Sequence, residues 1–165
     1  MKRLYLQIVW VVLGVFVLPS SSSAKIFHSK RKAMKLAFPV ADQIKARHLF
    51  LSQKQVTHIQ KISSSKVRSR LVTVYVGKKK GKVTGYAFIQ REQVRTYPQV
   101  VMIVISPEGS IKSVHILAFH EPTEYLPPIR WLQQFQKKKL RPTLKLGYEI
   151  AGLAGSTMSA HSVTK

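Results

Sequence analysis

The central part of the chain alternates between apolar runs of strand length and short polar turns. Residues 70–76 and 82–90 are rich in Val, Thr and Tyr and flank a basic turn at 77–81. Residues 99–105 form a continuous apolar run, which indicates a central strand buried on both faces. A type I turn signature follows, and residues 111–119 return as the partner strand. Four strands with short connections predict an antiparallel sheet in an α+β fold.

Helices are expected before these strands in the sequence. Residues 40–51 show roughly helical spacing and predict a first helix. Its apolar positions are Val40, Ile44, Leu49 and Phe50. A second helix is expected to begin at the candidate N-cap Ser52 and to end at the serines 63–65. Its apolar face comprises Val56, Ile59 and Ile62.

The segment after the sheet, residues 120–128, contains three prolines and is expected to be irregular. Thr123 or Glu124 is the candidate cap of a helix whose apolar face comprises Ile129, Leu132 and Phe135. Residues 140–150 are interpreted as a connector with one further strand around 144–150. Helices that flank an antiparallel sheet complete the predicted architecture.

The first 24 residues have the three parts of a secretory signal. A basic start at residues 1–3 precedes fifteen largely apolar residues, 4–18, and Ser22 and Ala24 occupy the −3 and −1 positions. A spanning helix needs about 20 apolar residues, so a signal peptide is favoured over a retained anchor. The sequence thus predicts a signal segment at 1–24, a basic lead-in at 25–37 and one domain at 38–165. We expect an exported protein, periplasmic or otherwise extracytoplasmic, free or associated with the membrane.

Charge and cysteine content narrow the classes of function. The chain has 28 Lys and Arg against 6 Asp and Glu, a net charge of +22, and no cysteine. Disulfides, thiolate nucleophiles and Cys-ligated metals are therefore excluded, and the few carboxylates disfavour a calcium cage or a glycosidase. In an exported protein this charge favours an anionic membrane surface or an acidic partner protein over nucleic acid.

The carboxy-terminal segment carries the candidate chemistry. Gly155, Ser156 and Thr157 form a glycine-hydroxyl turn just before a predicted helix. Free main-chain N–H groups and hydroxyls at such a turn bind phosphate, and Gly155 would permit close approach of the backbone. The alternative is an ordinary helix start with Ser156 or Thr157 as the capping residue.

Residues 154–159, Ala-Gly-Ser-Thr-Met-Ser, resemble the Ser-Gly-Ala-Thr-x-Ser/Thr signature of the FMN-binding domain family. This family supplies flavin-carrying subunits of Rnf and sodium-pumping NADH:quinone oxidoreductase complexes, and small exported relatives. Further similarities occur in the same order along residues 38–165. They are Gly85-Tyr86-Ala87, the Pro-x-Gly-x-Ile-x-x-Val pattern at 107–114, Glu121-Pro122, Tyr125-Leu126, Trp131-Leu132 and Phe135.

The resemblance implies an exported protein with FMN as its cofactor, and it favours an electron carrier over a stand-alone enzyme. FMN would be attached covalently to Thr157 as a phosphoester by a flavin transferase. Gly155, Ser156 and Ser159 would then surround the phosphate. The transferase signature usually has Asp at the position of Ala151. The redox partner would be an acidic protein, such as a cytochrome or a membrane oxidoreductase.

Four other residues are candidates for contact with the flavin. Tyr86 and Tyr125 have aromatic faces that suit a flat ring, although single aromatics near a sheet more often belong to the core. Glu121 follows a strand and would bond either the flavin or a loop amide. His161 lies in the predicted final helix. Spacing of the histidines does not favour a metal site.

A second class of function fits the same fold. Cystatin-like domains also place a helix on an antiparallel sheet and need no cofactor. In that case the chain would be an exported binding module whose charge attaches it to anionic surfaces or partners, and residues 155–157 would only cap a helix.

Overall fold

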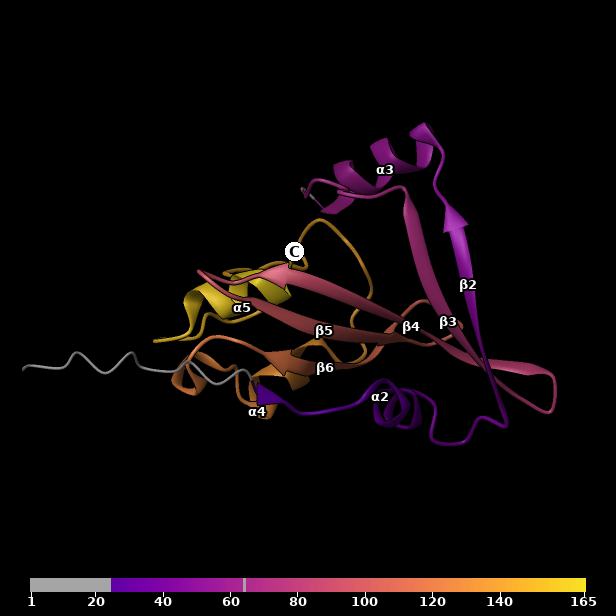
Figure 1. Ribbon diagram of the computed structural model, residues 1–165. Helices are drawn as coiled ribbons and strands as arrows, with labels where there is room; N and C mark the ends of the chain where they lie inside the picture. Colours follow the sequence, from indigo (N-terminus) through magenta and orange to yellow (C-terminus); the bar gives the residue numbers. More distant parts are fainter. Residues whose placement is uncertain (1–24, 64) are drawn as a thin grey trace, which may run out of the picture.

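The computed structural model describes residues 25–63 and 65–165, and these form an α+β fold (Figure 1). Six strands make one antiparallel sheet in the order β1-β6-β5-β4-β3-β2. The strands are β1 (Lys25–Ile26), β2 (Gln43–Phe50), β3 (Leu71–Lys79), β4 (Lys82–Gln93), β5 (Pro98–Ile105) and β6 (Ile111–Phe119). The predicted fold class and the four predicted strands are confirmed.

Short turns set the register of the central strands. Gly109 N–H donates to the Ser106 carbonyl at 3.0 Å, which closes the predicted turn between β5 and β6. Between β3 and β4, Lys80 and Gly81 both have positive φ (48° and 79°), as a two-residue type I′ hairpin requires. The Asp42 carboxylate accepts the Lys80 N–H at 2.7 Å and thereby anchors this hairpin.

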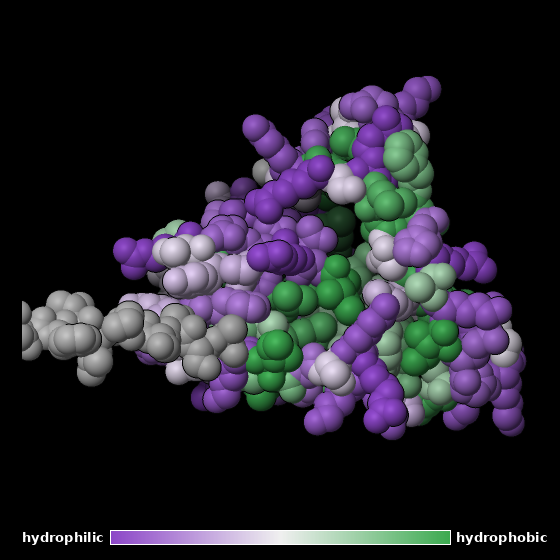
Figure 2. Space-filling view, viewed as in Figure 1, coloured by the Kyte–Doolittle hydropathy of each residue, from purple (hydrophilic) through white to green (hydrophobic). Residues whose placement is uncertain are grey.

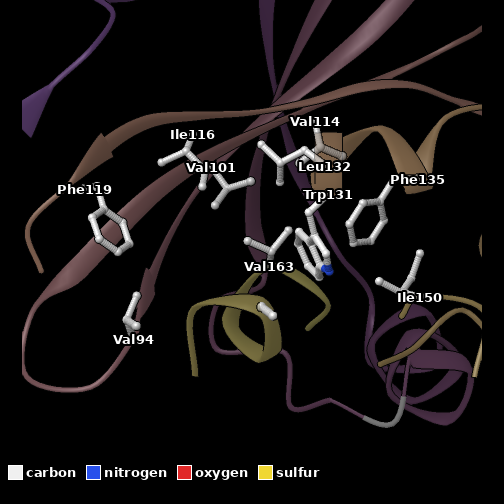
Figure 3. Close-up of a cluster of buried hydrophobic side chains, with 11 residues drawn as sticks. Val94, Val101, Val114, Ile116, Phe119, Trp131, Leu132, Phe135, Ile150 and Val163 are labelled. Atoms are coloured by element: carbon white, nitrogen blue, oxygen red, sulfur yellow. The ribbon is translucent and has the colours of Figure 1, made fainter. Parts of the chain in front are cut away.

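Helices cover both faces of the sheet. Helix α2 (Lys30–Ala37) buries Ala33, Met34 and Ala37 against one face, in a cluster that includes Met102 and Val104. The other face packs against α4 (Ile129–Leu132), the 3₁₀ turn η2 (Gln133–Phe135) and α5 (Thr157–Val163). Figure 3 shows this second core, in which the rings of Trp131 and Phe135 pack edge to face with their centroids 5.5 Å apart. The 3₁₀ turn η1 (Thr123–Tyr125) leads into α4.

One part of the molecule projects from the rest of the sheet (Figure 1). Residues 71–74 of β3 pair with β2 alone, because the β3–β4 ladder covers only Tyr75–Lys79. Helix α3 (Gln53–Ser63) lies at the tip of this two-stranded ribbon. We call β2, α3 and residues 71–74 of β3, with the segments that join them, the arm (residues 43–74, of which residue 64 lies outside the described part). Figure 2 shows hydrophobic residues in the hollow between the arm and the remaining sheet, with hydrophilic ones on its left side.

The helix predicted at residues 40–51 is wrong, because most of this segment is strand β2. Its apolar residues are not gathered on a buried face: Val40, Ile44, Leu49 and Phe50 are all exposed, Phe50 by 70%. The segment instead pairs along its whole length with β3. Long-range pairing therefore decides the conformation here, and local spacing does not.

The following helix is confirmed as α3. Ser52 Oγ accepts the Gln55 N–H at 3.3 Å, while Gln55 Oε1 accepts the Ser52 N–H at 2.8 Å. This reciprocal pair is a capping box. Of the predicted apolar face, Val56 is buried.

Residues 25–37 are not the linker expected from their basic composition. Residues 25–26 form β1, and Ser29 caps α2 by accepting the Lys32 N–H at 3.4 Å. The buried face of α2 consists of two alanines and one methionine, so the hydrophobic pattern of this segment is too weak to predict a helix. The expected signal at 1–24 lies outside the described residues.

The helix expected to begin at the candidate caps Thr123 or Glu124 is divided into η1, α4 and η2. Neither Thr123 nor Glu124 caps α4, whose N-cap position is Pro128. Leu132 and Phe135 are buried as predicted, but Ile129 is 76% exposed. The further strand expected around 144–150 is reduced to a single bridge between Leu146 and Ile150. Among the residues that the structure describes, none of the helices has the length and apolar character needed to cross a bilayer.

Candidate functional site

A cavity of about 240 Å³ opens beside the start of α5. Its walls come from the segment just after β4, the segment after β6, and the turn before α5 with the first residues of that helix. Six of the eight predicted site residues line it, namely Glu121, Tyr125, Gly155, Ser156, Thr157 and Ser159. The fold thus brings together residues that lie up to 38 positions apart in the sequence.

The turn before α5 is shaped by Gly155, whose φ of 77° is in the left-handed region that favours glycine. Ser156 occupies the N-cap position of α5, but its hydroxyl donates to the Glu124 carbonyl at 3.4 Å. The Thr157 hydroxyl donates to the Leu153 carbonyl at 3.3 Å. No side chain among the described residues caps α5. The first N–H groups of this helix are therefore left for water or a ligand.

Glu121 holds the loop that forms the opposite wall. Its side-chain oxygen Oε1 accepts the main-chain N–H groups of Arg95, Thr96 and Tyr97 at 3.1, 2.7 and 2.7 Å. Burial raises the pKa of this carboxyl, but the three N–H donors and the Arg95 charge outweigh burial, and its pKa is lowered overall. Glu121 is consequently an ionised structural anchor. Of the two roles that the sequence leaves open for it, the structure shows the bond to loop amides.

A buried polar pair underlies the cavity. Ser159, 1% exposed, lines the cavity, and its Oγ has no hydrogen-bond partner among the described residues. Beside it, Gln99 is fully buried and donates to Ser162 Oγ at 3.0 Å, while its Oε1 is also without a partner in the described part of the chain. Unpaired buried polar atoms are costly. A ligand oxygen or water that bonds Ser159 would remove part of that cost.

Arg95 is a cavity residue that sequence analysis missed. It lies just after β4, and it is the only Lys or Arg among the residues described as lining the cavity. In a chain with 28 basic residues, no sequence signal separates Arg95 from the others. Its place in the wall of the cavity depends on the Glu121 anchor, which is a tertiary contact.

The two remaining predicted residues lie elsewhere. Tyr86 is in β4, paired with Ile105, and the seven residues between it and the cavity end of β4 correspond to roughly 23 Å. His161 is in α5 but is exposed and does not line the cavity. Tyr125, by contrast, is at the cavity with 39% of its surface exposed.

The chain matches no protein-family model, and no curated protein matches it. The assignment of the site accordingly depends on the residues and geometry described above.

Proposed function

We propose that this protein is an exported flavoprotein that carries FMN at the cavity beside α5 and transfers electrons. The supporting observation is the convergence of Thr157, Ser156 and Ser159 with Arg95 around one cavity. In this proposal a flavin transferase outside the cytoplasm joins the FMN phosphorus to the Thr157 hydroxyl oxygen. The P–O bond between that phosphorus and the leaving group of an activated flavin nucleotide breaks, and the hydroxyl proton is lost with it. The bound flavin would supply the electron-transfer chemistry.

The polar groups of the cavity suit a phosphate monoanion or diester. Ser159 Oγ is a buried donor without a partner among the described residues, and the first N–H groups of α5 have no side-chain cap. Arg95 supplies a cation, which favours phosphate by charge and by hydrogen bonding. The Glu121 charge opposes an anion, but its bonds to three N–H groups offset part of that charge.

The cavity size indicates which part of FMN would lie inside the cavity and which part at its mouth. Pockets for whole drug-sized ligands measure about 300–1,000 Å³. A cavity of about 240 Å³ would take the phosphate and adjoining polyol chain and leave the ring system at the mouth. Tyr125, partly exposed at this rim, is then the aromatic residue placed to contact the ring.

The cationic surface has two consequences for the proposed redox function. It would stabilise reduced and semiquinone anions of the flavin, and it would attract an acidic partner such as a cytochrome. Few acids oppose this charge, since the whole chain has only six.

Spectroscopy of the protein co-expressed with a flavin transferase tests the proposal. The protein should be yellow, and flavin fluorescence should stay with the polypeptide after denaturation. The variant Thr157→Ala should lose the retained fluorescence, whereas Thr123→Ala, at an exposed position outside the cavity, should keep it. A colourless wild-type protein under these conditions would refute the proposal.

A second candidate function is adhesion to anionic surfaces without a cofactor. It is favoured by the arm, which contains seven Lys and Arg and no acidic residue. All of β2 is exposed, and Phe50 and Leu71 add apolar surface beside these cations. Sedimentation with phosphatidylglycerol vesicles tests this candidate: binding should fall steeply with salt and with Lys45→Gln plus Arg47→Gln.

A further inference from the structure

A second cavity, of about 430 Å³, lies along the outer edge of β6. Its walls come from residues 27–28, from Leu36 of α2, from Ser113–Ile116 of β6 and from the segment between Leu126 and Gln136. It is separate from the cavity beside α5, although the two flank the same turn. Tyr125 lines the first cavity and Leu126 lines the second. We call the second cavity the β6 groove.

The β6 groove differs from the rest of the molecule in charge. None of the thirteen described residues that line it is Lys, Arg, Asp or Glu, and eight are apolar. About a fifth of the chain is charged, so a lining of this size would be expected to include two or three charged residues. A charged ligand would find no Lys, Arg, Asp or Glu among these lining residues, and its burial would be costly.

The groove nevertheless contains hydrogen-bonding groups. His115 Nε2 bonds Ser113 Oγ at 2.9 Å, and His28 lies close enough to influence the same imidazole. Burial, and then His28, lower the pKa of His115, which therefore stays neutral near pH 7. Because β1 pairs only with Ala118 and Phe119, the main-chain edge at Ser113–Ile116 has no strand partner in the described chain.

We propose that the β6 groove binds a small uncharged amphiphile, an apolar chain or ring that carries one hydroxyl or carbonyl oxygen. The apolar walls would take its body. The neutral imidazole of His115, the Ser113 hydroxyl and the main-chain edge would bond its oxygen. The volume of the groove lies within the range of small-molecule sites. This proposal does not depend on flavin binding at the other cavity.

A second copy of the chain is the less favoured occupant. Exposed apolar residues at the rim, Ile129 (76%) and Leu36 (43%), would contribute to a dimer contact. The adjoining surface is basic, with Lys35 next to Leu36 and Arg130 next to Ile129. Two such surfaces would repel each other, whereas an uncharged small molecule avoids this cost.

Binding of the uncharged dye N-phenylnaphthylamine to the purified protein tests the proposal. Its fluorescence should rise on binding, and decanol should displace it. Decanoate and decyltrimethylammonium, which have the same apolar chain with a charged head, should displace it at least about tenfold less well. The protein should remain monomeric by sedimentation over the same concentrations.

Two variants locate the dye. Ser113→Phe should fill the groove without adding charge, and Ile129→Asp should place a carboxylate at its rim, at the start of α4 where an acid does not harm the helix. Each should weaken binding about tenfold or more, while Leu140→Asp, at a similarly exposed apolar position outside the groove, should not. Equal displacement by all three decyl compounds, unchanged binding in both groove variants, or a dimer that Ile129→Asp dissociates would overturn the proposal.

Discussion

The indole N–H of Trp131 donates a hydrogen bond to the main-chain carbonyl of Ala151 at 2.8 Å. The neighbouring Gln134 Oε1 accepts the Ala151 N–H at 2.9 Å, so that one residue is held at both main-chain groups. Trp131 is itself buried in the core beneath α5. The core thereby fixes the segment that precedes Gly155 and Thr157.

Replacement of Trp131 by Phe should destabilise the protein by about 2–4 kcal/mol, because it removes this hydrogen bond and leaves part of the indole volume empty. Amide exchange in residues 151–157 should accelerate most. Chemical denaturation and hydrogen exchange would measure the two effects. Tyr148→Phe, at a 70% exposed aromatic, is the control and should change neither. Uniform acceleration across the whole sheet would contradict a local anchoring role.

Gly77 lies beneath the ring of Phe38. A Cβ at Gly77 would stand 2.3 Å from Phe38 Cδ1, too close for any side chain. Gly77→Ala should therefore displace Phe38 and cost about 1–3 kcal/mol of unfolding free energy. At Gly152, where a Cβ would meet nothing within 4 Å, the same replacement should be nearly neutral. Similar denaturation midpoints for the two variants would disprove this packing argument.

The Glu121 anchor predicts a pH dependence of stability. Its folded pKa is below the ordinary value of 4.5, so ionised Glu121 stabilises the fold above that pH, and the contribution is lost as pH falls through the folded pKa. Glu121→Gln should cost about 1–3 kcal/mol at pH 7. The difference from wild type should shrink in acid.

Urea denaturation between pH 7 and pH 3 would measure the effect. Glu124→Gln, an exposed carboxylate three residues away, is the matched control and should leave the profile unchanged. A Glu121→Gln deficit that stays constant into acid would show that the carboxylate charge is not what holds the 95–97 loop.

Ala151 offers a test of the proposed attachment by gain of function. The transferase signature considered in the sequence analysis usually has Asp at this position. The Ala151 side chain is exposed, and its main-chain groups are fixed by Trp131 and Gln134, so Asp fits without rearrangement. Ala151→Asp should raise the fraction of flavin-bearing protein obtained with limiting transferase. Gly152→Asp, one residue removed, should not.

How far the sequence predicts this structure depends on how far apart in the sequence the interacting residues lie. The four strands between Leu71 and Phe119 are connected by short turns, and the residues of each turn specify its conformation. The sequence therefore predicts these strands closely. The spacing of apolar residues in β2 predicts a helix, because that spacing carries no information about the pairing of this segment with β3. The sequence does not predict helix α2, because two of its three buried residues, Ala33 and Ala37, contribute little hydrophobic signal.

The candidate site shows the same division. Gly155, Ser156, Thr157 and Ser159 are local to one turn, and their proximity follows from the sequence. The sequence offers Glu121 and Tyr125 as candidates for flavin contact, but their place at one cavity depends on the fold, and no sequence signal points to Arg95. The position of Arg95 depends on three main-chain bonds to Glu121, 24 to 26 residues away.

Intact-mass and peptide-mapping mass spectrometry of protein co-expressed with a flavin transferase tests the central claim most directly. The account predicts a mass increase of one FMN less one water, located on the peptide that contains Thr157 and absent from Thr157→Ala. An unmodified mass in the wild-type protein, or the same increase in Thr157→Ala, would contradict it.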